Sequence, residues 1–125
     1  GEEIRKYGVV IPGETNGRLT EVKGIIEKPQ GEIPSQLTSL GRFILTPDIF
    51  RLIEKTPKKN GEVYLTDSMS MQAQTKGVYA YEFEGRRYDI GDKQGFLEAG
   101  IEFALRDEKL KDRLKEYLKN LVANL

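Results

Sequence analysis

The chain has 125 residues, of which 38% are hydrophobic and 32% are charged, and its 20 basic and 20 acidic residues give a formal net charge of zero. A chain of this length forms one domain and can bury a substantial core. Zero net charge argues against binding of a nucleic acid polymer by phosphate neutralisation, although one or two local cations can still hold a small anion.

Two residue types that often build functional sites do not occur. The sequence has no cysteine and no histidine, so disulfides, thiolate metal sites and the commonest general base and zinc ligand are excluded. No apolar run approaches the ~18 residues that a membrane-spanning helix needs, and the charged N-terminus lacks the apolar core of a signal peptide. We therefore expect a soluble, cytoplasmic domain.

Two strands are predicted near the start of the chain. Residues 5–11 are typical of a buried strand, and residues 19–26 form a second one. The turn dipeptides Pro12-Gly13 and Asn16-Gly17 lie between them and predict a hairpin-like connection. Gly8 removes a side chain from the first strand, which indicates either tight packing against a neighbour or the close approach of a ligand to the backbone.

The second strand ends in Glu27-Lys28-Pro29. Successive strand side chains point to opposite faces, but a proline cannot donate to the ladder and holds the preceding residue extended. The strand should end here, and its rim can turn both charged groups toward one pocket. A carboxylate accepts hydrogen bonds from hydroxyls and an ammonium group attracts phosphate, so the pair suits a phosphorylated sugar. A solvated loop end with an ordinary acid and base is the alternative.

The middle of the chain is predicted to contain a connector, a short strand and a short helix. Residues 30–40 are polar and without periodicity, and residues 41–45 are typical of a short apolar strand. Thr46-Pro47-Asp48 then predicts a helix start, with threonine as N-cap, proline at the first helical position and aspartate complementing the helix dipole. The apolar face of this helix should consist of Ile49, Leu52 and Ile53.

A second helix and a third apolar strand should follow. Asn60-Gly61 predicts a turn, after which Thr66 is the expected helix N-cap. Residues 78–84 alternate in the manner of a strand. Its aromatic side chains recur with period two, which is more typical of a core than of a stacking platform. These side chains are Tyr79, Tyr81 and Phe83.

The C-terminal part begins with an acidic motif, Tyr88-Asp89-Ile90-Gly91-Asp92, which we expect at a strand end just before a helix. Asp92 suits the N-cap of that helix, which leaves Asp89 to face a metal or substrate. Helices are predicted at about 93–106 and 109–124, and the apolar face of the last could dock on this domain, on missing parts of a longer protein or on another subunit. Strands that alternate with helices favour an α/β domain with a mixed sheet and flanking helices.

In order and spacing, five motifs resemble the C-terminal half of bacterial UTP–glucose-1-phosphate uridylyltransferases. The resemblance extends from about Lys6 through the last helix, and it implies the Rossmann-like fold of nucleotide-diphospho-sugar transferases. It also implies the reaction of UTP with glucose 1-phosphate to UDP-glucose and pyrophosphate. The motifs are Tyr7-Gly8, Glu27-Lys28-Pro29, Gly41-Arg42-Phe43, Glu62-Val63-Tyr64-Leu65-Thr66-Asp67 and Tyr88-Asp89-Ile90-Gly91.

The resemblance implies a role for each matching position. Glu27 would grip the sugar hydroxyls, and Lys28 would be the catalytic cation that contacts the phosphates. Gly8 and Gly41 would lie where the backbone approaches the sugar, and Asp89 would be one of two aspartates that hold Mg²⁺. The implied partners are glucose 1-phosphate, UTP and UDP-glucose. A bare sheet edge and exposed apolar surface would in addition favour a homo-oligomer.

One family feature is missing. None of the 13 glycines forms the glycine-rich nucleotide loop, and the second metal-binding aspartate has no counterpart. We therefore expect residues 1–125 to be the sugar-phosphate-binding part of a longer enzyme, inactive without an N-terminal nucleotide-binding half. Two alternatives remain: a sugar-1-phosphate nucleotidyltransferase that uses dTTP or ATP, and a non-catalytic α/β binding module in which Glu27 and Lys28 are an ordinary rim pair.

Overall fold

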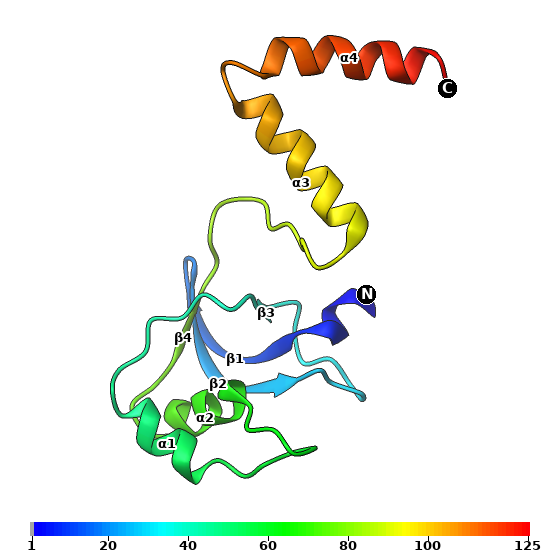
Figure 1. Cartoon of the computed structure of the whole chain (residues 1–125). Coiled ribbons are helices and arrows are strands. Elements are labelled where there is room, and N and C mark those ends of the chain that lie inside the picture. The colour runs from blue at the N-terminus through cyan, green and yellow to red at the C-terminus, as the bar shows by residue number, and fades with distance from the viewer. Residues whose placement is uncertain (1) are drawn as a thin grey trace. The chain divides into compact units, whose positions relative to one another are not determined.

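The computed structural model describes residues 2–125 (Figure 1). The chain divides into two compact units, Gly1–Phe83 and Glu84–Leu125. The first unit contains a small sheet with two helices, and the second contains the last two helices. The chain contains both strands and helices, so the predicted α/β class is confirmed.

The sheet of the first unit has four strands in the order β3-β1-β2-β4, and each neighbouring pair among the described residues is antiparallel rather than mixed. Its centre is the predicted hairpin of two long strands, but the first strand extends from Gly8 to Asn16 and not over residues 5–11 as predicted, because Arg5 and Lys6 belong to a 3₁₀ helix. Pro12 and Gly13 do not form the expected turn but lie within β1, where the register shifts, because a proline cannot donate to the ladder. The elements are a 3₁₀ helix at Glu2–Lys6, β1 at Gly8–Asn16, β2 at Leu19–Glu27, β3 at Thr38–Ser39 and β4 at Tyr79–Tyr81.

Helices α1 (Ile49–Lys55) and α2 (Leu65–Ala73) lie on one side of the hairpin (Figure 1). Apolar side chains from both strands and both helices meet between them and form the core, as the helical spacing of the sequence predicts. The buried members are Val10, Val22, Ile25, Ile49 and Met69.

Adjacent isoleucines of β2 allow a matched test of this core. Ile25 is 6% exposed and Ile26 is 38% exposed. Ile25→Ala should lower the free energy of unfolding by about 2–5 kcal/mol, because it leaves a cavity between β2 and the helices. Ile26→Ala should cost clearly less, because its side chain already contacts solvent. Urea unfolding followed by circular dichroism measures both values, and equal losses would contradict this description of the core.

Two further predictions, a strand and an aromatic core, are wrong in the first unit. Residues 41–45 do not form a strand, because β1 instead pairs with Thr38–Ser39, two residues earlier. The predicted aromatic core is also absent, since Tyr79, Tyr81 and Phe83 are 48–67% exposed. Ala80, the small residue between the two tyrosines, packs against the core in their place. β4 is an edge strand, and large aromatic side chains there can remain on the open face.

Thr46 was expected to be the N-cap of α1, but it is not. The N-cap of α1 is Asp48, and the Thr46 hydroxyl donates to its carboxylate Oδ1 at 2.6 Å. Lys76 Nζ lies 3.2 Å from the same oxygen. The hydrogen bond from Thr46, followed by the charge of Lys76, lowers the pKa of Asp48 from 3.8 to about 2.

This shift gives the stability a defined dependence on pH. A carboxyl group whose pKa is lower in the folded state stabilises the fold above its unfolded pKa, and loses that contribution as the pH falls through the folded pKa. The contribution of Asp48 should therefore disappear between about pH 4 and pH 2. Urea unfolding over this range should show a smaller acid-dependent loss for Asp48→Asn than for the unchanged protein. Parallel pH profiles would show that Asp48 is not responsible.

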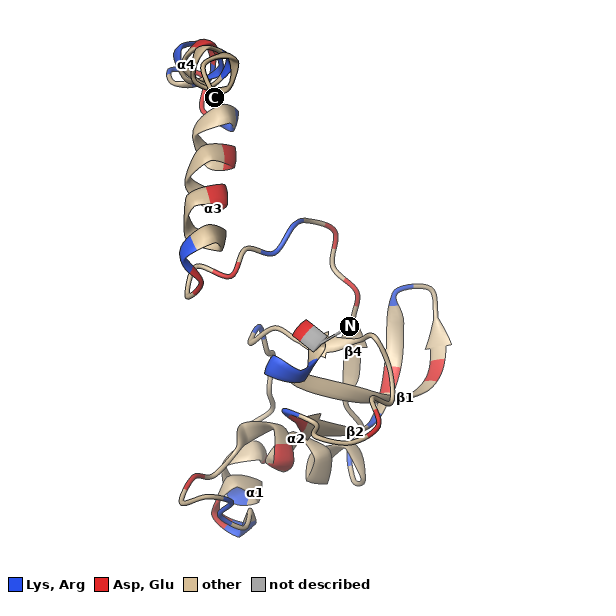
Figure 2. Ribbon diagram, turned by 90° about the vertical axis from the view of Figure 1, so that its right-hand side faces the viewer, with Lys and Arg blue, Asp and Glu red and all other residues tan. Residues whose placement is uncertain are grey.

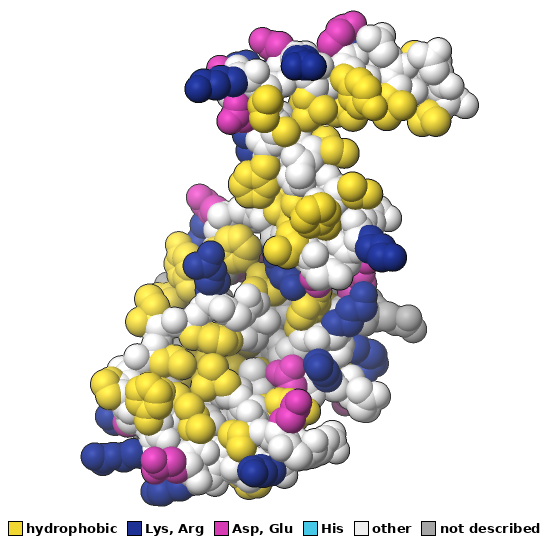
Figure 3. Space-filling view, viewed as in Figure 1, with side chains coloured by type: hydrophobic (Ala, Val, Ile, Leu, Met, Phe, Trp, Pro, Cys, Tyr) yellow, Lys and Arg dark blue, Asp and Glu magenta, His cyan; other side chains and the backbone are white. Residues whose placement is uncertain are grey.

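The second unit consists of α3 (Lys93–Arg106) and α4 (Lys111–Ala123), close to the predicted bounds. Asp92 caps α3 as expected, since its carboxylate accepts a hydrogen bond from the Gly95 N–H at 2.8 Å. Hydrophobic side chains remain exposed along both helices (Figure 3), and α4 has no buried residue. Within residues 2–125, no helix is both long and apolar enough to cross a bilayer.

Candidate functional site

The candidate site lies where three strands end at one rim of the sheet. Gly8 at the start of β1 pairs with Glu27 at the end of β2 on one side and with Ser39 at the end of β3 on the other. The first turn of α2 reaches the same rim through Thr66. Antiparallel pairing therefore brings together residues that are far apart in the sequence.

Glu27 is held at this rim by its neighbours. Its side chain is half-buried, and its Oε2 accepts a hydrogen bond from the Thr66 hydroxyl at 3.0 Å. A Cβ at Gly8 would lie 3.0 Å from the same carboxylate oxygen and 3.2 Å from the Thr66 methyl group. Gly8 is thus tightly packed, which is one of the two readings that the sequence left open. The close packing restricts where the Glu27 carboxylate can lie.

Lys28 adopts a backbone conformation that the sequence did not predict. Its φ is +45°, in the left-handed region, although the following proline led us to expect an extended residue. This conformation costs a non-glycine residue roughly 1 kcal/mol or more, and such strain is often found at functional sites. The Lys28 N–H donates to the Tyr7 carbonyl at 3.1 Å, and its side chain is exposed. The kink ends β2 and removes Lys28 from the alternation of the strand.

Arg5 stabilises the loop after this kink. Its guanidinium group donates from Nη1 to the carbonyl of Pro29 at 3.0 Å and to that of Gly31 at 2.7 Å. Pro29 itself is buried. The 3₁₀ helix therefore anchors the segment that follows Lys28, a role that the sequence analysis did not assign to Arg5.

Gly41 is located in the coil after β3, with φ of +72° and open space where a Cβ would be. Only glycine adopts this conformation without strain. It follows Ser39 by two residues, so their Cα atoms are within ~7 Å of each other. Gly41 therefore belongs to the same rim as Gly8 and Glu27 by way of β3.

Asp89 belongs to the second unit. The strand that was expected to precede it is not formed. Its Oδ1 accepts a hydrogen bond from the Gly91 N–H at 3.1 Å, and its Oδ2 lies 3.3 Å from Nη2 of Arg87. The side chain is 43% exposed. A carboxylate is a ligand type that Mg²⁺ prefers, but no group of three or more acidic side chains gathers among residues 2–125. Asp89 fits one contact of a magnesium site, not the whole site.

A polar and aromatic cluster attaches the Asp89 loop to α3. The Tyr88 hydroxyl donates to Glu102 and accepts from Arg106 Nη2 at 2.8 Å, and Arg86 also pairs with Glu102. The Arg86 guanidinium lies 5.1 Å from the centre of the Tyr88 ring. The hydrogen bond to Glu102 raises the pKa of Tyr88, and the same bond lowers the pKa of Glu102. This cluster fixes the backbone next to Asp89.

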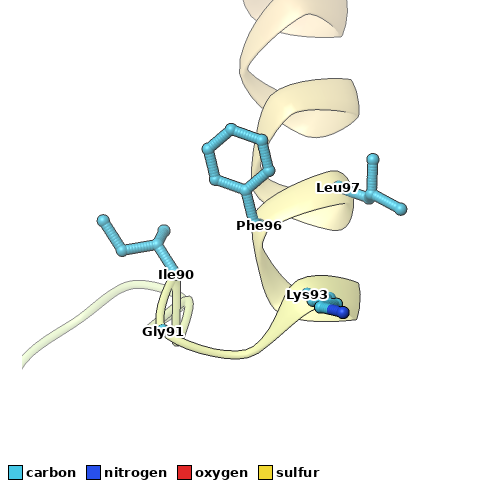
Figure 4. A pocket seen from close by; sticks show the side chains of 5 residues that line it. All are labelled: Ile90, Gly91, Lys93, Phe96 and Leu97. Atoms are coloured by element: carbon cyan, nitrogen blue, oxygen red, sulfur yellow. The ribbon is translucent and has the colours of Figure 1, made fainter.

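An open hollow of about 330 Å³ lies at the start of α3. In Figure 4, Ile90 and Phe96 project to one side of the chain, while Leu97 projects from the other side of the helix. The hollow is lined mainly by apolar side chains, with Lys93 as the only charged one. A hollow with one cation and an otherwise apolar lining is a poor binding site for a phosphate group. Along the whole ribbon, acidic and basic residues are interspersed (Figure 2), in agreement with the zero net charge.

Thr66 is the site residue whose role the sequence analysis missed. Sequence reasoning made it the N-cap of α2, but the N-cap is Tyr64 and the helix begins at Leu65. Thr66 is buried, and its hydroxyl binds Glu27. A signal was present in the sequence: Thr66 and Ser70 place two hydroxyl groups four residues apart, on the face of α2 that packs on the sheet.

Comparison with known proteins identifies the family. A family model described as nucleotidyl transferase matches residues 1–105. The UTP–glucose-1-phosphate uridylyltransferase of Staphylococcus haemolyticus is 47% identical over 118 residues, which are 93% of this chain and 41% of that protein. The enzyme of the same name from Bacillus subtilis is 41% identical over 123 residues, 97% of this chain and 42% of its own length.

Solved structures agree with the sequence relatives. A UDP-glucose pyrophosphorylase complexed with UDP-glucose superposes with a TM-score of 0.77 at 42% identity, covering 85% of this chain and 41% of that one. The UTP-bound enzyme from Acinetobacter baumannii gives a TM-score of 0.83 at 33% identity, covering 96% of this chain and 42% of that one. The chain spans about two-fifths of the length of these relatives. The predicted resemblance and fold are therefore confirmed, and the chain belongs to the nucleotidyl transferase family.

Proposed function

We propose that this chain forms the sugar-phosphate-binding part of a longer UTP–glucose-1-phosphate uridylyltransferase, with the N-terminal nucleotide-binding half outside it. The names of the relatives support this assignment. The observation that carries it is the rim itself, where the half-buried Glu27 carboxylate is held by Thr66 next to the exposed, left-handed Lys28. An oriented acceptor beside an exposed cation suits a ligand with hydroxyl groups at one end and phosphate at the other.

In this proposal each rim residue has a distinct task. Glu27 accepts hydrogen bonds from the sugar hydroxyls, since a carboxylate has more acceptor sites than the single one used by Thr66. Lys28 neutralises phosphate charge in the transition state. The backbone at Gly8 and Gly41 lies along the sugar. In the alternative of a non-catalytic binding module, none of these residues contacts a sugar or a phosphate.

The proposed reaction needs positioning more than covalent chemistry. A phosphate oxygen of glucose 1-phosphate attacks the α-phosphorus of UTP and forms a new P–O bond. The bond from that phosphorus to the β-phosphate breaks, and pyrophosphate leaves with the electron pair. Orientation and charge neutralisation are the main contributions of the protein to such transfers, which is compatible with a chain that contains no histidine or cysteine.

Magnesium is part of the proposal. A bound Mg²⁺ would neutralise charge on the phosphate oxygens, and Asp89 would supply one oxygen ligand, with the others coming from the substrates and from outside this chain. Asp89→Asn should raise the Mg²⁺ concentration needed for half-maximal activity by about tenfold, in line with losing one charged ligand. A magnesium titration of initial rates measures this. An unaltered metal dependence would mean that Asp89 has a structural role, such as its bonds to Arg87 and Gly91.

Assays of the complete protein with glucose 1-phosphate and each of UTP, dTTP and ATP test the substrate assignment. Formation of UDP-glucose and pyrophosphate from UTP alone is the expected result. Preference for dTTP or ATP would favour the related nucleotidyltransferases, and inactivity with all three would favour the binding module. Such substrates also favour a cytoplasmic location.

We also propose that this chain associates into a homo-oligomer. Tyr117, Leu121 and Val122 of α4 are 45–67% exposed, and exposed apolar surface of this kind often marks an interface. Sedimentation at increasing concentration should show association of the chain, whereas a single monomeric species at all concentrations would contradict it.

A further inference from the structure

One edge of β2 is bound by a helix where a neighbouring strand would otherwise be. β4 pairs with β2 over residues 19–21, and the Val22 N–H still donates to the Val78 carbonyl. Beyond this point no strand among residues 2–125 lies on that side of the part of β2 that leads to Glu27. α2 lies along this part instead. Polar side chains of α2 and of its C-cap residue Gln74 bind the strand at three alternate residues, and the two bonds to the strand backbone take the place of a ladder.

The contacts form a regular row. Gln74 Nε2 donates to the Lys23 carbonyl at 2.6 Å. Ser70 Oγ accepts from the Ile25 N–H at 2.8 Å and lies 3.2 Å from the Ile25 carbonyl. Thr66 Oγ1 donates to the Glu27 carboxylate at 3.0 Å. The row therefore pairs helix positions 66, 70 and 74 with strand positions 27, 25 and 23.

The spacing of the two backbones explains why this row is in register. Four helical residues advance by ~6.0 Å, and two strand residues advance by ~6.8 Å. A helix that runs along a strand can therefore contact alternate strand residues with every fourth side chain. The contacts of Gln74 and Ser70 are to the backbone of β2, so they fix the position of α2 independently of Glu27. Thr66 is thereby placed next to the Glu27 side chain.

The third contact limits the freedom of the carboxylate. Thr66 is 9% exposed and cannot easily move away. The close approach of Gly8 to both residues closes another direction. A carboxylate that is already oriented loses less rotamer freedom when a ligand binds. The hydrogen bond from Thr66 also occupies one oxygen, which directs the remaining acceptor sites away from α2.

We propose that Thr66 is a positioning residue for sugar binding: its buried hydroxyl, set in place by the row along α2, orients the Glu27 carboxylate toward the sugar hydroxyls. This inference rests on the proposed function, because it assigns the sugar to Glu27. Thr66 does not itself touch the substrate. Its effect should therefore be confined to recognition of the sugar phosphate and should require Glu27.

The test uses the complete protein and substitutions at Thr66. Thr66→Val keeps the shape and removes the hydroxyl, whereas Thr66→Ser keeps the hydroxyl. Thr66→Val should raise the KM for glucose 1-phosphate about tenfold, which corresponds to about 1.4 kcal/mol, and leave the KM for UTP within about twofold. Thr66→Ser should restore most of the affinity. In a Glu27→Ala background, Thr66→Val should have no further effect on this KM.

A second buried threonine provides a matched control. Thr56 is 6% exposed, and its hydroxyl lies 2.7 Å from that of Ser68, away from the rim. Thr56→Val should lower the melting temperature without changing either KM. If Thr66→Val does not fold, Ser70→Ala removes the preceding contact of the row and should raise the KM for glucose 1-phosphate about threefold.

The outcomes distinguish a failure of the proposed uridylyltransferase activity from a failure of the proposed role of Thr66. Absence of uridylyltransferase activity in the unchanged protein would overturn the proposed function, and this inference with it. Normal activity, together with an unchanged KM in Thr66→Val, would overturn only the role of Thr66. So would an equal KM increase in Thr66→Val and Thr66→Ser, or additive effects of Thr66→Val and Glu27→Ala, since each would mean that Thr66 does not act through Glu27.

Discussion

Replacing Lys28 by alanine in the complete protein is expected to lower kcat by about 10²–10³-fold. This loss corresponds to about 2.7–4 kcal/mol, the usual contribution of one charge-stabilising contact in a transition state. We expect kcat and kcat/KM to fall together, because Lys28 should contact the phosphates most strongly while charge develops on them. Steady-state rates with UTP and glucose 1-phosphate measure the effect.

The backbone at Lys28 explains why no neighbouring lysine should replace it. The left-handed φ of +45° is maintained by the hydrogen bond to the Tyr7 carbonyl and by the Arg5 bonds to the loop after Pro29. Such strained backbone conformations occur preferentially at functional sites, where they fix the direction of a side chain. The backbone of Lys28 is thus held at the end of β2, so that its side chain departs from the strand alternation.

Lys23→Ala is the matched control for this prediction. Lys23 lies on the same strand, its side chain is 55% exposed, and it pairs with Glu21 at 2.7 Å. Its removal should leave kcat within about twofold, because exposed ion pairs contribute little. If Lys28→Ala behaved like Lys23→Ala, or changed only the KM, the proposed catalytic role of Lys28 would be wrong.

Glu27→Ala is expected to weaken the binding of glucose 1-phosphate by about 10–150-fold. Hydrogen bonds to a charged group contribute about 1.5–3 kcal/mol each, and sites built to bind hydroxyls discriminate strongly when the partner is lost. The KM for UTP should change little. Glu27→Gln keeps the shape but has a weaker acceptor, so its effect should be intermediate.

Glu21 serves as the control carboxylate on β2. Its hydrogen bond with Lys23 lowers its pKa, so Glu21 is charged at neutral pH. Glu21→Ala should leave both KM values unchanged. Equal kinetics for Glu27→Ala and the unchanged protein toward glucose 1-phosphate would remove Glu27 from the sugar site.

The local elements of this protein could be predicted well because their signals are local. The period of apolar residues and the Asp92 cap located α3, and the same period located α4 to within two residues. The hairpin and the second long strand also followed from their apolar residues and the Asn16-Gly17 turn, whereas the bounds of β1 did not, since its pairing with β2 continues past Pro12 to Asn16. In each case the residues that determine the element are also the residues that compose it.

The errors concern elements whose partners lie elsewhere in the chain. Residues 41–45 are apolar enough for a strand, but a strand also needs a free edge, and β1 pairs with Thr38–Ser39 instead. The aromatic residues of β4 alternate correctly, yet their exposure depends on which face of an edge strand is covered. Neither fact is contained in the local pattern.

The sequence by itself determined the family, the hairpin, the helices and the identity of the charged pair at the end of β2. Only the tertiary structure decided that Gly8 lies against Glu27, that Lys28 is left-handed, and that Thr66 binds a carboxylate rather than capping a helix. The physical reason is that a hydroxyl can satisfy its hydrogen bond either locally or across the fold. Which partner it takes depends on the packing of α2 along the open edge of β2, and that packing joins residues some forty positions apart.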